Sequence, residues 1–140
     1  MTIQGTPLLI DARLPNRAYP NDAGADVYCN GKLTLEPGEI KAHPLQFAID
    51  IPEGHMGVIM CRSGLAKKGV VCFNSPIDPG YDGNVHAIVG NFGTETQSFG
   101  PNDRIGQLVI VPVVDARITS KQILHRGSNG FGSTGGTGGK

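Results

Sequence analysis

The apolar residues of this chain come in short runs bounded by glycine or proline, and this pattern restricts the fold more than any other feature. In the clearest run, Leu45, Phe47, Ile49 and Ile51 alternate with other residues, a period of two that is typical of a strand with one buried face. Many short strands separated by turns predict an all-β domain, with one short helical turn near Gly64–Lys68. Further strands are predicted at Leu8–Ile10, Met56–Cys61, Val70–Phe73, Val85–Val89 and Ile105–Val111.

Glycine and proline are unusually frequent. The 140 residues include 21 glycines and 10 prolines, about 22% of the chain. This share exceeds the roughly 12% of average proteins but stays below the 25–30% of low-complexity sequences. The chain is therefore expected to fold with many turns, and its length fits one domain.

The charge balance and the cysteine pattern exclude several functional classes. Twelve Lys and Arg residues balance twelve Asp and Glu residues, so the chain lacks the net positive charge that gathers nucleic acid or an anionic membrane. Three cysteines without a C-x-x-C pair argue for a reducing compartment, and four scattered histidines show no zinc pattern. Neither a leader segment nor an apolar run of membrane-spanning length is visible. We expect a cytoplasmic protein.

The composition changes at the C-terminus. Residues 127–140 hold seven glycines, and with Arg126 they offer one guanidinium, one aromatic ring and two hydroxyls, from Phe131, Ser133 and Thr134. Glycine lets backbone N–H groups approach phosphate oxygens, arginine binds phosphate through two donors, and an aromatic ring can stack on a base. We expect a domain at residues 1–125 and a flexible arm at 126–140, either a nucleotide clamp or simply a loose terminus.

A second polar cluster, Arg62-Ser63-Gly64, follows a predicted strand and enters the predicted helical turn. The N-terminus of a helix presents unpaired N–H groups, so an anion could bind there. A capped helix with a surface arginine explains the same residues equally well.

A third cluster is a predicted hairpin at Ile77–Asn84. Asp78 lies where the strand enters the turn, and its carboxylate could act as a general base on water or could simply shape the turn. Two further acidic stretches, Asp22–Asp26 and Asp103–Gln107, could contribute a carboxylate to a hydrated Mg²⁺. Each of these signals is weak alone.

Taken in order, five stretches resemble the five motifs of the homotrimeric dUTP pyrophosphatase (dUTPase) family, a similarity that spans nearly the whole chain. They are Ala23–Val27, Arg62–Ala66, Ile77–Gly83, Asp103–Gln107 and the tail from Arg126. The resemblance implies a β-jelly-roll-like barrel of the β-clip type. It also implies a homotrimer with active sites shared between subunits. The implied reaction converts dUTP to dUMP and pyrophosphate with Mg²⁺, lowering dUTP and supplying dUMP for thymidylate synthesis.

The same resemblance implies a role for each site residue. Asp78 would activate the water that attacks the α-phosphate, and Gln107 would contact the phosphate and water region. Tyr81 would pack under the deoxyribose, and Asp26 would reach Mg²⁺ through water. The α- and β-phosphates would be held by Arg62, Ser63 and Gly64. The γ-phosphate would be held by Arg126, Gly132, Ser133 and Thr134. The uracil would be covered by Phe131 and read by main-chain groups near Cys72, Pro76, Ile77 and His86.

The sequence departs from the family pattern at a few positions. Asn102 stands where the family usually has glycine, and asparagine is the residue that best tolerates a positive φ in its place. Cys72 and Ser75 stand where asparagine and glycine are common, which leaves their effect on uracil selectivity open.

Two alternatives remain at this point. One is a dCTP deaminase or a bifunctional deaminase of the same fold: the dCTP deaminases share an Ile-Asp-Pro-Gly hairpin, but their catalytic glutamate would fall at Ile88. A dUTPase can also act as a nucleotide-sensing regulator through protein partners, which the sequence does not exclude.

Overall fold

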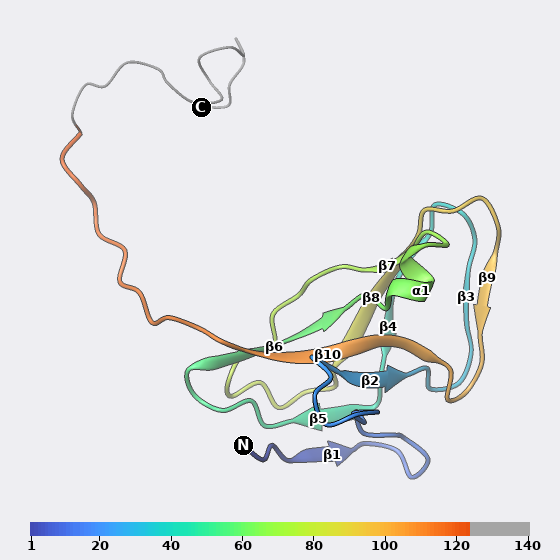
Figure 1. Cartoon of the computed structure of the whole chain (residues 1–140), viewed down its shortest axis with the longest axis horizontal. Helices are drawn as coiled ribbons and strands as arrows, with labels where there is room; N and C mark the ends of the chain where they lie inside the picture. Colours follow the sequence, from blue (N-terminus) through green and yellow to red (C-terminus); the bar gives the residue numbers. More distant parts are fainter. Residues whose placement is uncertain (124–140) are drawn as a thin grey trace.

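The structure is a computed structural model that describes residues 1–123 (Figure 1). In this part of the chain, strands dominate and one short helix, α1, interrupts them. The elements are β1 (Gly5–Pro7), β2 (Ala25–Tyr28), β3 (Leu33–Leu35), β4 (Ile40–Pro44), β5 (Phe47–Ile49), β6 (His55–Met60), α1 (Ser63–Ala66), β7 (Val70–Cys72), β8 (His86–Asn91), β9 (Gln97–Phe99) and β10 (Arg104–Pro112).

In the part of the chain that the structure describes, the strands pair only in antiparallel ladders. Among the described residues they form two-stranded sheets β1-β5 and β3-β9 and three-stranded sheets β2-β10-β6 and β4-β8-β7. The prediction of an all-β, jelly-roll-like domain with one short helix is confirmed. The sheets are open, however, and do not close into a barrel.

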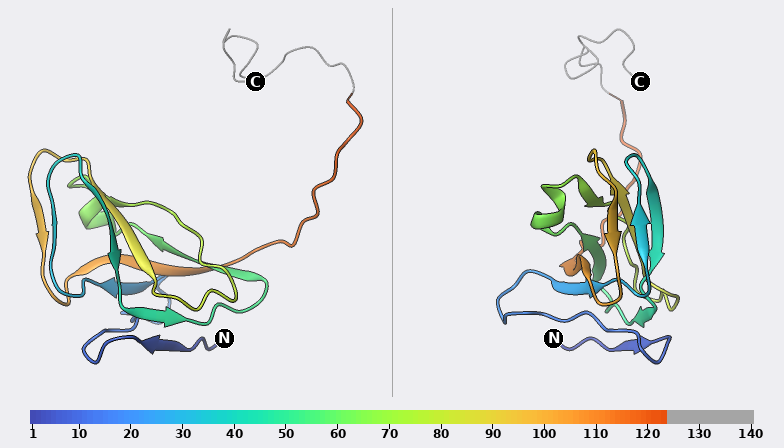
Figure 2. Two further views of the ribbon diagram at one scale, coloured as in Figure 1. Left: turned by 180° about the vertical axis from the view of Figure 1, so that it is seen from behind. Right: turned by 90° about the vertical axis from the view of Figure 1, so that its right-hand side faces the viewer.

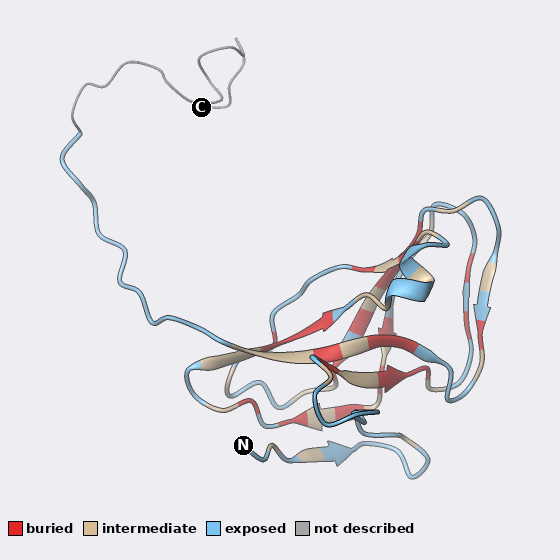
Figure 3. Ribbon diagram, viewed as in Figure 1, coloured by how far each residue is buried: buried red, intermediate tan, exposed pale blue. Residues whose placement is uncertain are grey.

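The apolar core lies between these small sheets (Figure 3). Its largest fully buried side chains include Phe47, Leu35, Leu45 and Ile105. The long strand β10 runs through the middle, where it pairs with β2 on one side and β6 on the other. The site residues Asp26 on β2 and Gln107 on β10 therefore belong to one sheet, and Arg62 follows the end of the third strand of that sheet, β6.

The alternation at Leu45–Ile51 is confirmed, because Leu45, Phe47, Ile49 and Ile51 are all buried. The prediction of one continuous strand is wrong. β4 ends at Pro44 and β5 begins at Phe47, because the backbone turns at Gln46, which has a φ of 65°. Every second residue from Leu45 to Ile51 is thus buried, although a sharp corner separates the two strands.

The strand predicted at Leu8–Ile10 is also wrong. These residues form a bend and a turn, closed by a hydrogen bond from the Ala12 N–H to the Leu9 carbonyl oxygen. Their side chains are exposed, so no sheet holds them, and β1 instead covers the preceding residues Gly5–Pro7. The helix also begins one residue earlier than predicted, at Ser63, directly after the extended Arg62.

Residues 113–123 leave the folded body as an extended, exposed segment (Figures 1 and 2). The arm expected at 126–140 lies outside the described residues. Within the described part, no helix is both long and apolar enough to cross a membrane.

Candidate active site

The predicted hairpin is present at the β7-β8 ladder. Cys72 pairs with Val89, and the Phe73 N–H donates to the Ile88 carbonyl oxygen. Beyond this point the two arms separate around a loop. Ile77 anchors that loop to the start of β6, exchanging two backbone hydrogen bonds of 2.7 and 2.9 Å with Gly57.

A cavity of about 260 Å³ lies between the two arms. Pro76, Ile77, Asp78, Tyr81 and His86, five of the residues predicted from the sequence, line it. The remaining lining residues are Ser75, Asn84, Val85 and Ile88. An exposed carboxylate, an aromatic ring and the backbone of two extended arms therefore meet in one pocket, as a nucleoside site requires.

Cys72 does not line this pocket. Its thiol is buried and lies 3.5 Å from the Ile105 carbonyl oxygen, and its N–H donates to Cys61 Sγ at 3.2 Å. Burial, and to a lesser degree the nearby Cys61, raises the pKa of the Cys72 thiol to about 12. This side chain packs in the core, and a contact from Cys72 to uracil stays a prediction.

Tyr81 is held in place by its own loop. Its hydroxyl donates to the Asn84 carbonyl oxygen at 2.8 Å, while much of the ring stays exposed. Gly83 lies beneath the ring, where an added Cβ would come within 2.7 Å of the tyrosine oxygen. The glycine of the Tyr-x-Gly motif is thus required by the close approach of this ring.

Asp26, Arg62 and Gln107 form a second group on the sheet β2-β10-β6. Asp26 pairs with Gln107 in register, and its carboxylate lies 3.9 Å from Arg62 Nε and 3.6 Å from Arg104 Nη1. Gln107 Nε2 donates to the Cys61 carbonyl oxygen at 2.8 Å, just before Arg62. Ser63 and Gly64 follow, both exposed at the start of α1. Two guanidinium groups therefore lie beside exposed backbone at the end of β6.

The two groups lie toward different ends of β6. The hairpin loop is tied to Gly57, near the start of this strand, whereas Arg62 follows its last residue, Met60. In Figure 1 the loop after β7 runs away from α1, toward the other end of the molecule. Arg62 and Arg104 line a separate pocket of about 380 Å³. The structure thus does not bring Asp78 and Arg62 together within one chain.

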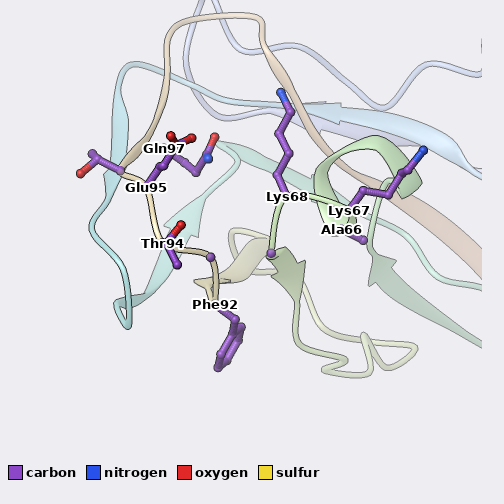
Figure 4. A pocket seen from close by; sticks show the side chains of 10 residues that line it. Ala66, Lys67, Lys68, Phe92, Thr94, Glu95 and Gln97 are labelled. Atoms are coloured by element: carbon purple, nitrogen blue, oxygen red, sulfur yellow. The ribbon is translucent and has the colours of Figure 1, made fainter.

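A further pocket of about 620 Å³ lies between α1 and the β8-β9 connection (Figure 4). Its charged lining residues are Lys67, Lys68 and Glu95, and none of the predicted site residues in the described part of the chain lines it. The Lys68 and Phe92 side chains point in opposite directions from it (Figure 4).

Three residues that organise these groups were not predicted from the sequence. Arg104 pairs with Asp26, and Asn84 and Gln46 pair with each other through their side chains. Arg104 was signalled only by its place between Asp103 and Gln107, and 38 residues separate Gln46 from Asn84, so no local pattern indicates that contact. The predicted residues Arg126, Phe131, Gly132, Ser133 and Thr134 lie outside the described residues.

Known proteins match the chain over most of its length. Residues 11–135 match the dUTPase family. The deoxyuridine 5'-triphosphate nucleotidohydrolase of Anaeromyxobacter sp. (strain Fw109-5) is 42% identical, with 94% of this chain and 91% of that protein aligned. The protein of the same name from Leifsonia xyli is 40% identical, over 91% of this chain and 88% of that protein.

Solved structures give the same result. The dUTPase of Staphylococcus bacteriophage 80alpha with dUpNHpp has a TM-score of 0.83 at 28% identity, covering 96% of this chain and 98% of that one. A dUTPase mutant from phage phi11 of S. aureus, described as coordinating a structural Mg(II) ion, has a TM-score of 0.81 at 27% identity, over 88% of this chain and 98% of that one.

Proposed function

The chain belongs to the dUTPase family, whose members are dUTP diphosphatases, and from this premise we propose that it hydrolyses dUTP to dUMP and pyrophosphate. The observation that carries the proposal is the hairpin pocket, which joins the exposed carboxylate of Asp78 to the ring of Tyr81. In a cell this reaction lowers dUTP and supplies dUMP for thymidylate synthesis.

Asp78 acts as the general base in this proposal. Its carboxylate takes a proton from water, the water oxygen bonds to the α-phosphorus, and the bond from that phosphorus to the α,β-bridging oxygen breaks. Pyrophosphate then leaves with the bridging oxygen. Gln107, held by its bond to the Cys61 carbonyl oxygen, orients the phosphate and water region.

Arg62, Ser63 and Gly64 bind the α- and β-phosphates. The guanidinium supplies positive charge, and the exposed start of α1 offers N–H and hydroxyl donors. Negative charge that develops on the phosphate oxygens is stabilised by donors already fixed in place. Local groups thus neutralise the substrate, which agrees with a chain of zero formal net charge.

The donor set around Asp26 fits a Mg²⁺ ion held mainly by the nucleotide. Among the described residues no three His, Cys, Asp or Glu side chains gather as a metal site. The Asp26 carboxylate is already paired with two arginines, so it suits contact through water better than direct ligation. When bound, Mg²⁺ neutralises charge on the triphosphate.

The hairpin selects the base and the sugar. Uracil is read by main-chain groups around Pro76, Ile77 and His86, and a narrow pocket excludes the methyl group of thymine. The Tyr81 ring packs under the deoxyribose and leaves no room for a 2′-hydroxyl. A contact of this kind discriminates by clash as well as by attraction.

We further propose a homotrimer with shared active sites. The separation of Asp78 and Arg62 along β6 supports it, because one chain does not assemble both groups at one place. The arm at 126–140, with Arg126, Phe131, Gly132, Ser133 and Thr134, then closes over a bound nucleotide. Closure would exclude water from the phosphates.

The test is a product analysis with purified protein, Mg²⁺ and four nucleotides. We expect dUTP to yield dUMP and pyrophosphate, with dCTP, dTTP and UTP hydrolysed at least about a hundredfold more slowly, the range reached by a site that clashes with the wrong substrate. Comparable turnover of dCTP or UTP, or release of ammonia, would contradict the proposal.

Ile88 argues against a dCTP deaminase. It lines the same pocket as Asp78, at the position where the glutamate of the deaminases would stand. A regulatory role through protein partners stays a prediction; the phage 80alpha dUTPase is described as controlling transfer of virulence genes by a G protein-like mechanism.

A further inference from the structure

Asn84 lies at the centre of the hydrogen bonds that shape the hairpin pocket. Its carbonyl oxygen accepts the Tyr81 hydroxyl at 2.8 Å and faces His86 Nδ1 at 2.9 Å. A carbonyl oxygen only accepts, so the His86 nitrogen that faces it is the protonated one. One peptide group thus fixes both the ring proposed to pack under the sugar and a side chain of the arm proposed to read the base.

The side chain of Asn84 anchors this peptide to a different part of the molecule. Asn84 Oδ1 accepts the Gln46 N–H at 2.8 Å, and Asn84 Nδ2 donates to Gln46 Oε1 at 3.0 Å. Two flanking backbone hydrogen bonds complete the connection. The Leu45 N–H donates to the Val85 carbonyl oxygen, and the Val85 N–H donates to the Phe47 carbonyl oxygen. The β4-β5 corner is therefore joined to the second arm of the hairpin at consecutive positions.

Gln46 adopts a backbone conformation that glutamine seldom takes. Its φ of 65° lies in the left-handed region, which non-glycine residues occupy only at a cost. A glycine would satisfy this corner better, but it would lose the Oε1 atom that accepts from Asn84. The residue at this corner thus sacrifices local stability and gains a side-chain contact with the pocket.

We propose that Asn84 and Gln46 form a positioning pair that sets the orientation of Tyr81 and thereby the discrimination between deoxyribose and ribose. Neither side chain needs to touch the reacting atoms. Asn84 holds its own carbonyl oxygen in place, that oxygen holds the Tyr81 hydroxyl, and Gln46 holds Asn84. This inference rests on the proposed dUTP hydrolysis and on the proposed packing of Tyr81 under the sugar.

The test compares kcat/KM for dUTP and UTP in the wild type and in Asn84→Ala, Gln46→Gly and Gln46→Glu. Asn84→Ala and Gln46→Gly should lower the dUTP-to-UTP ratio about tenfold, the effect of losing one well-formed hydrogen bond. Gln46→Glu keeps an acceptor for Asn84 Nδ2 and should retain the ratio. Gln46→Gly also relieves the backbone cost, so it should fold at least as well as the wild type even if Asn84→Ala does not.

Two further variants separate positioning from a general loss of packing. Asn102→Gly is the control. Asn102 is the other described non-glycine residue with a positive φ, 69°, and replacing it with glycine should leave the dUTP-to-UTP ratio unchanged. Tyr81→Phe should lower the ratio, and combining it with Asn84→Ala should lower it no further, because both changes break one chain of contacts. An unchanged ratio in folded Gln46→Gly would overturn the inference while leaving dUTP hydrolysis intact; a wild type that does not hydrolyse dUTP would overturn the proposed function itself.

Discussion

The turn at Asp78 is closed by a backbone hydrogen bond, and the Asp78 carboxylate takes no part in it. The Tyr81 N–H donates to the Asp78 carbonyl oxygen at 3.2 Å, and Ile77 is held by Gly57 on the other side. These bonds persist with any side chain at position 78. A substitution there consequently tests the proposed chemistry with little effect on the fold.

Asp78→Asn should lower kcat for dUTP by about 10²- to 10⁴-fold, the usual contribution of a general base. The dissociation constant for the non-hydrolysable analogue dUpNHpp should change little, because asparagine keeps the size of the side chain. Pyrophosphate release and calorimetry measure the two quantities. Asp82→Asn, four residues along the same loop and exposed, is the matched control. Wild-type turnover in Asp78→Asn would remove Asp78 from the role of base.

His43 couples the fold to pH. The side chain is 6% exposed on β4, and its Nε2 accepts the Asn30 N–H at 3.1 Å, an arrangement that needs the neutral ring. Burial, and secondly the charge of His86, lowers the pKa of His43 below its ordinary value of 6.5. The unfolded chain therefore binds a proton at a higher pH than the folded chain does. The resulting stability is complete above about pH 6.5 and is lost as the pH falls below it.

His43→Gln isolates this effect, since glutamine offers an oxygen to the Asn30 N–H but does not titrate in this range. Urea denaturation at pH 7.5 and 5.5 should show the wild type losing more free energy of unfolding than the variant does. Equal losses in both proteins would mean that His43 titrates alike in the folded and unfolded states.

At the level of elements, the turn from α1 to β7 is fixed by two glycines whose backbones touch. Gly69 has a φ of +91°, and a Cβ added to it would lie 2.8 Å from the Cα of Gly93, in the loop after β8. The Phe92 N–H donates to the Gly69 carbonyl oxygen at 2.8 Å, so the turn after α1 is held against the loop that follows β8.

Gly69→Ala should therefore lower the free energy of unfolding by about 3 kcal/mol, the sum of a left-handed conformation and a backbone clash. Gly31→Ala is the matched control, because Gly31 has a φ of +78° but open space around it. It should cost only about 1 kcal/mol. Urea denaturation of both variants measures the difference, and equal costs would show that the loop at Gly93 moves aside freely.

Some of the strands could be predicted from the sequence alone and others could not. Alternating burial at Leu45–Ile51 and the runs that became β6, β7, β8 and β10 were predictable, because core-facing strands need apolar residues at every second position. The corner at Gln46 was not, because it depends on a partner 38 residues away. The strand predicted at Leu8–Ile10 was wrong because a short apolar run has the same pattern whether its residues are buried in a sheet or exposed to solvent.

The same limit applies to the site. The motifs identified Asp26, Arg62, Asp78, Tyr81 and Gln107 one by one, and the structure places them in the two groups described above. Side-chain direction could not be predicted: the Cys72 thiol faces the core although its strand borders the hairpin. Period two assigns residues to faces of a strand, but it does not say which face the ligand approaches.

On the scale of the whole molecule, the predicted site residues of one chain lie in two separate groups. The hairpin pocket has the carboxylate of Asp78 and an aromatic ring, and the end of β6 has the arginines. Residues 113–116 line a pocket of about 730 Å³ together with Asp78, and beyond them residues 117–123 form an extended segment on which Ile118 and Ile123 are exposed. An assembly in which neighbours complete each other's sites explains all three observations, and it predicts a particle of three times 14.7 kDa.

Complementation between inactive chains tests that assembly directly. Asp78→Asn chains lack the proposed base, and Arg62→Ala chains lack the guanidinium proposed to bind phosphate, so each variant alone should be nearly inactive. Coexpressed with two different tags and purified through both, they form mixed trimers. If Asp78 and Arg62 of one site come from different subunits, one of the three sites in each mixed trimer, about a third of all sites, regains both groups. Activity should then rise to a comparable fraction of the wild type.

Two Asp78→Asn chains carrying the same two tags provide the control and should stay inactive. Mixed trimers no more active than their parents would show that one chain supplies both residues, and the hairpin would then have to approach Arg62 by a rearrangement within the subunit.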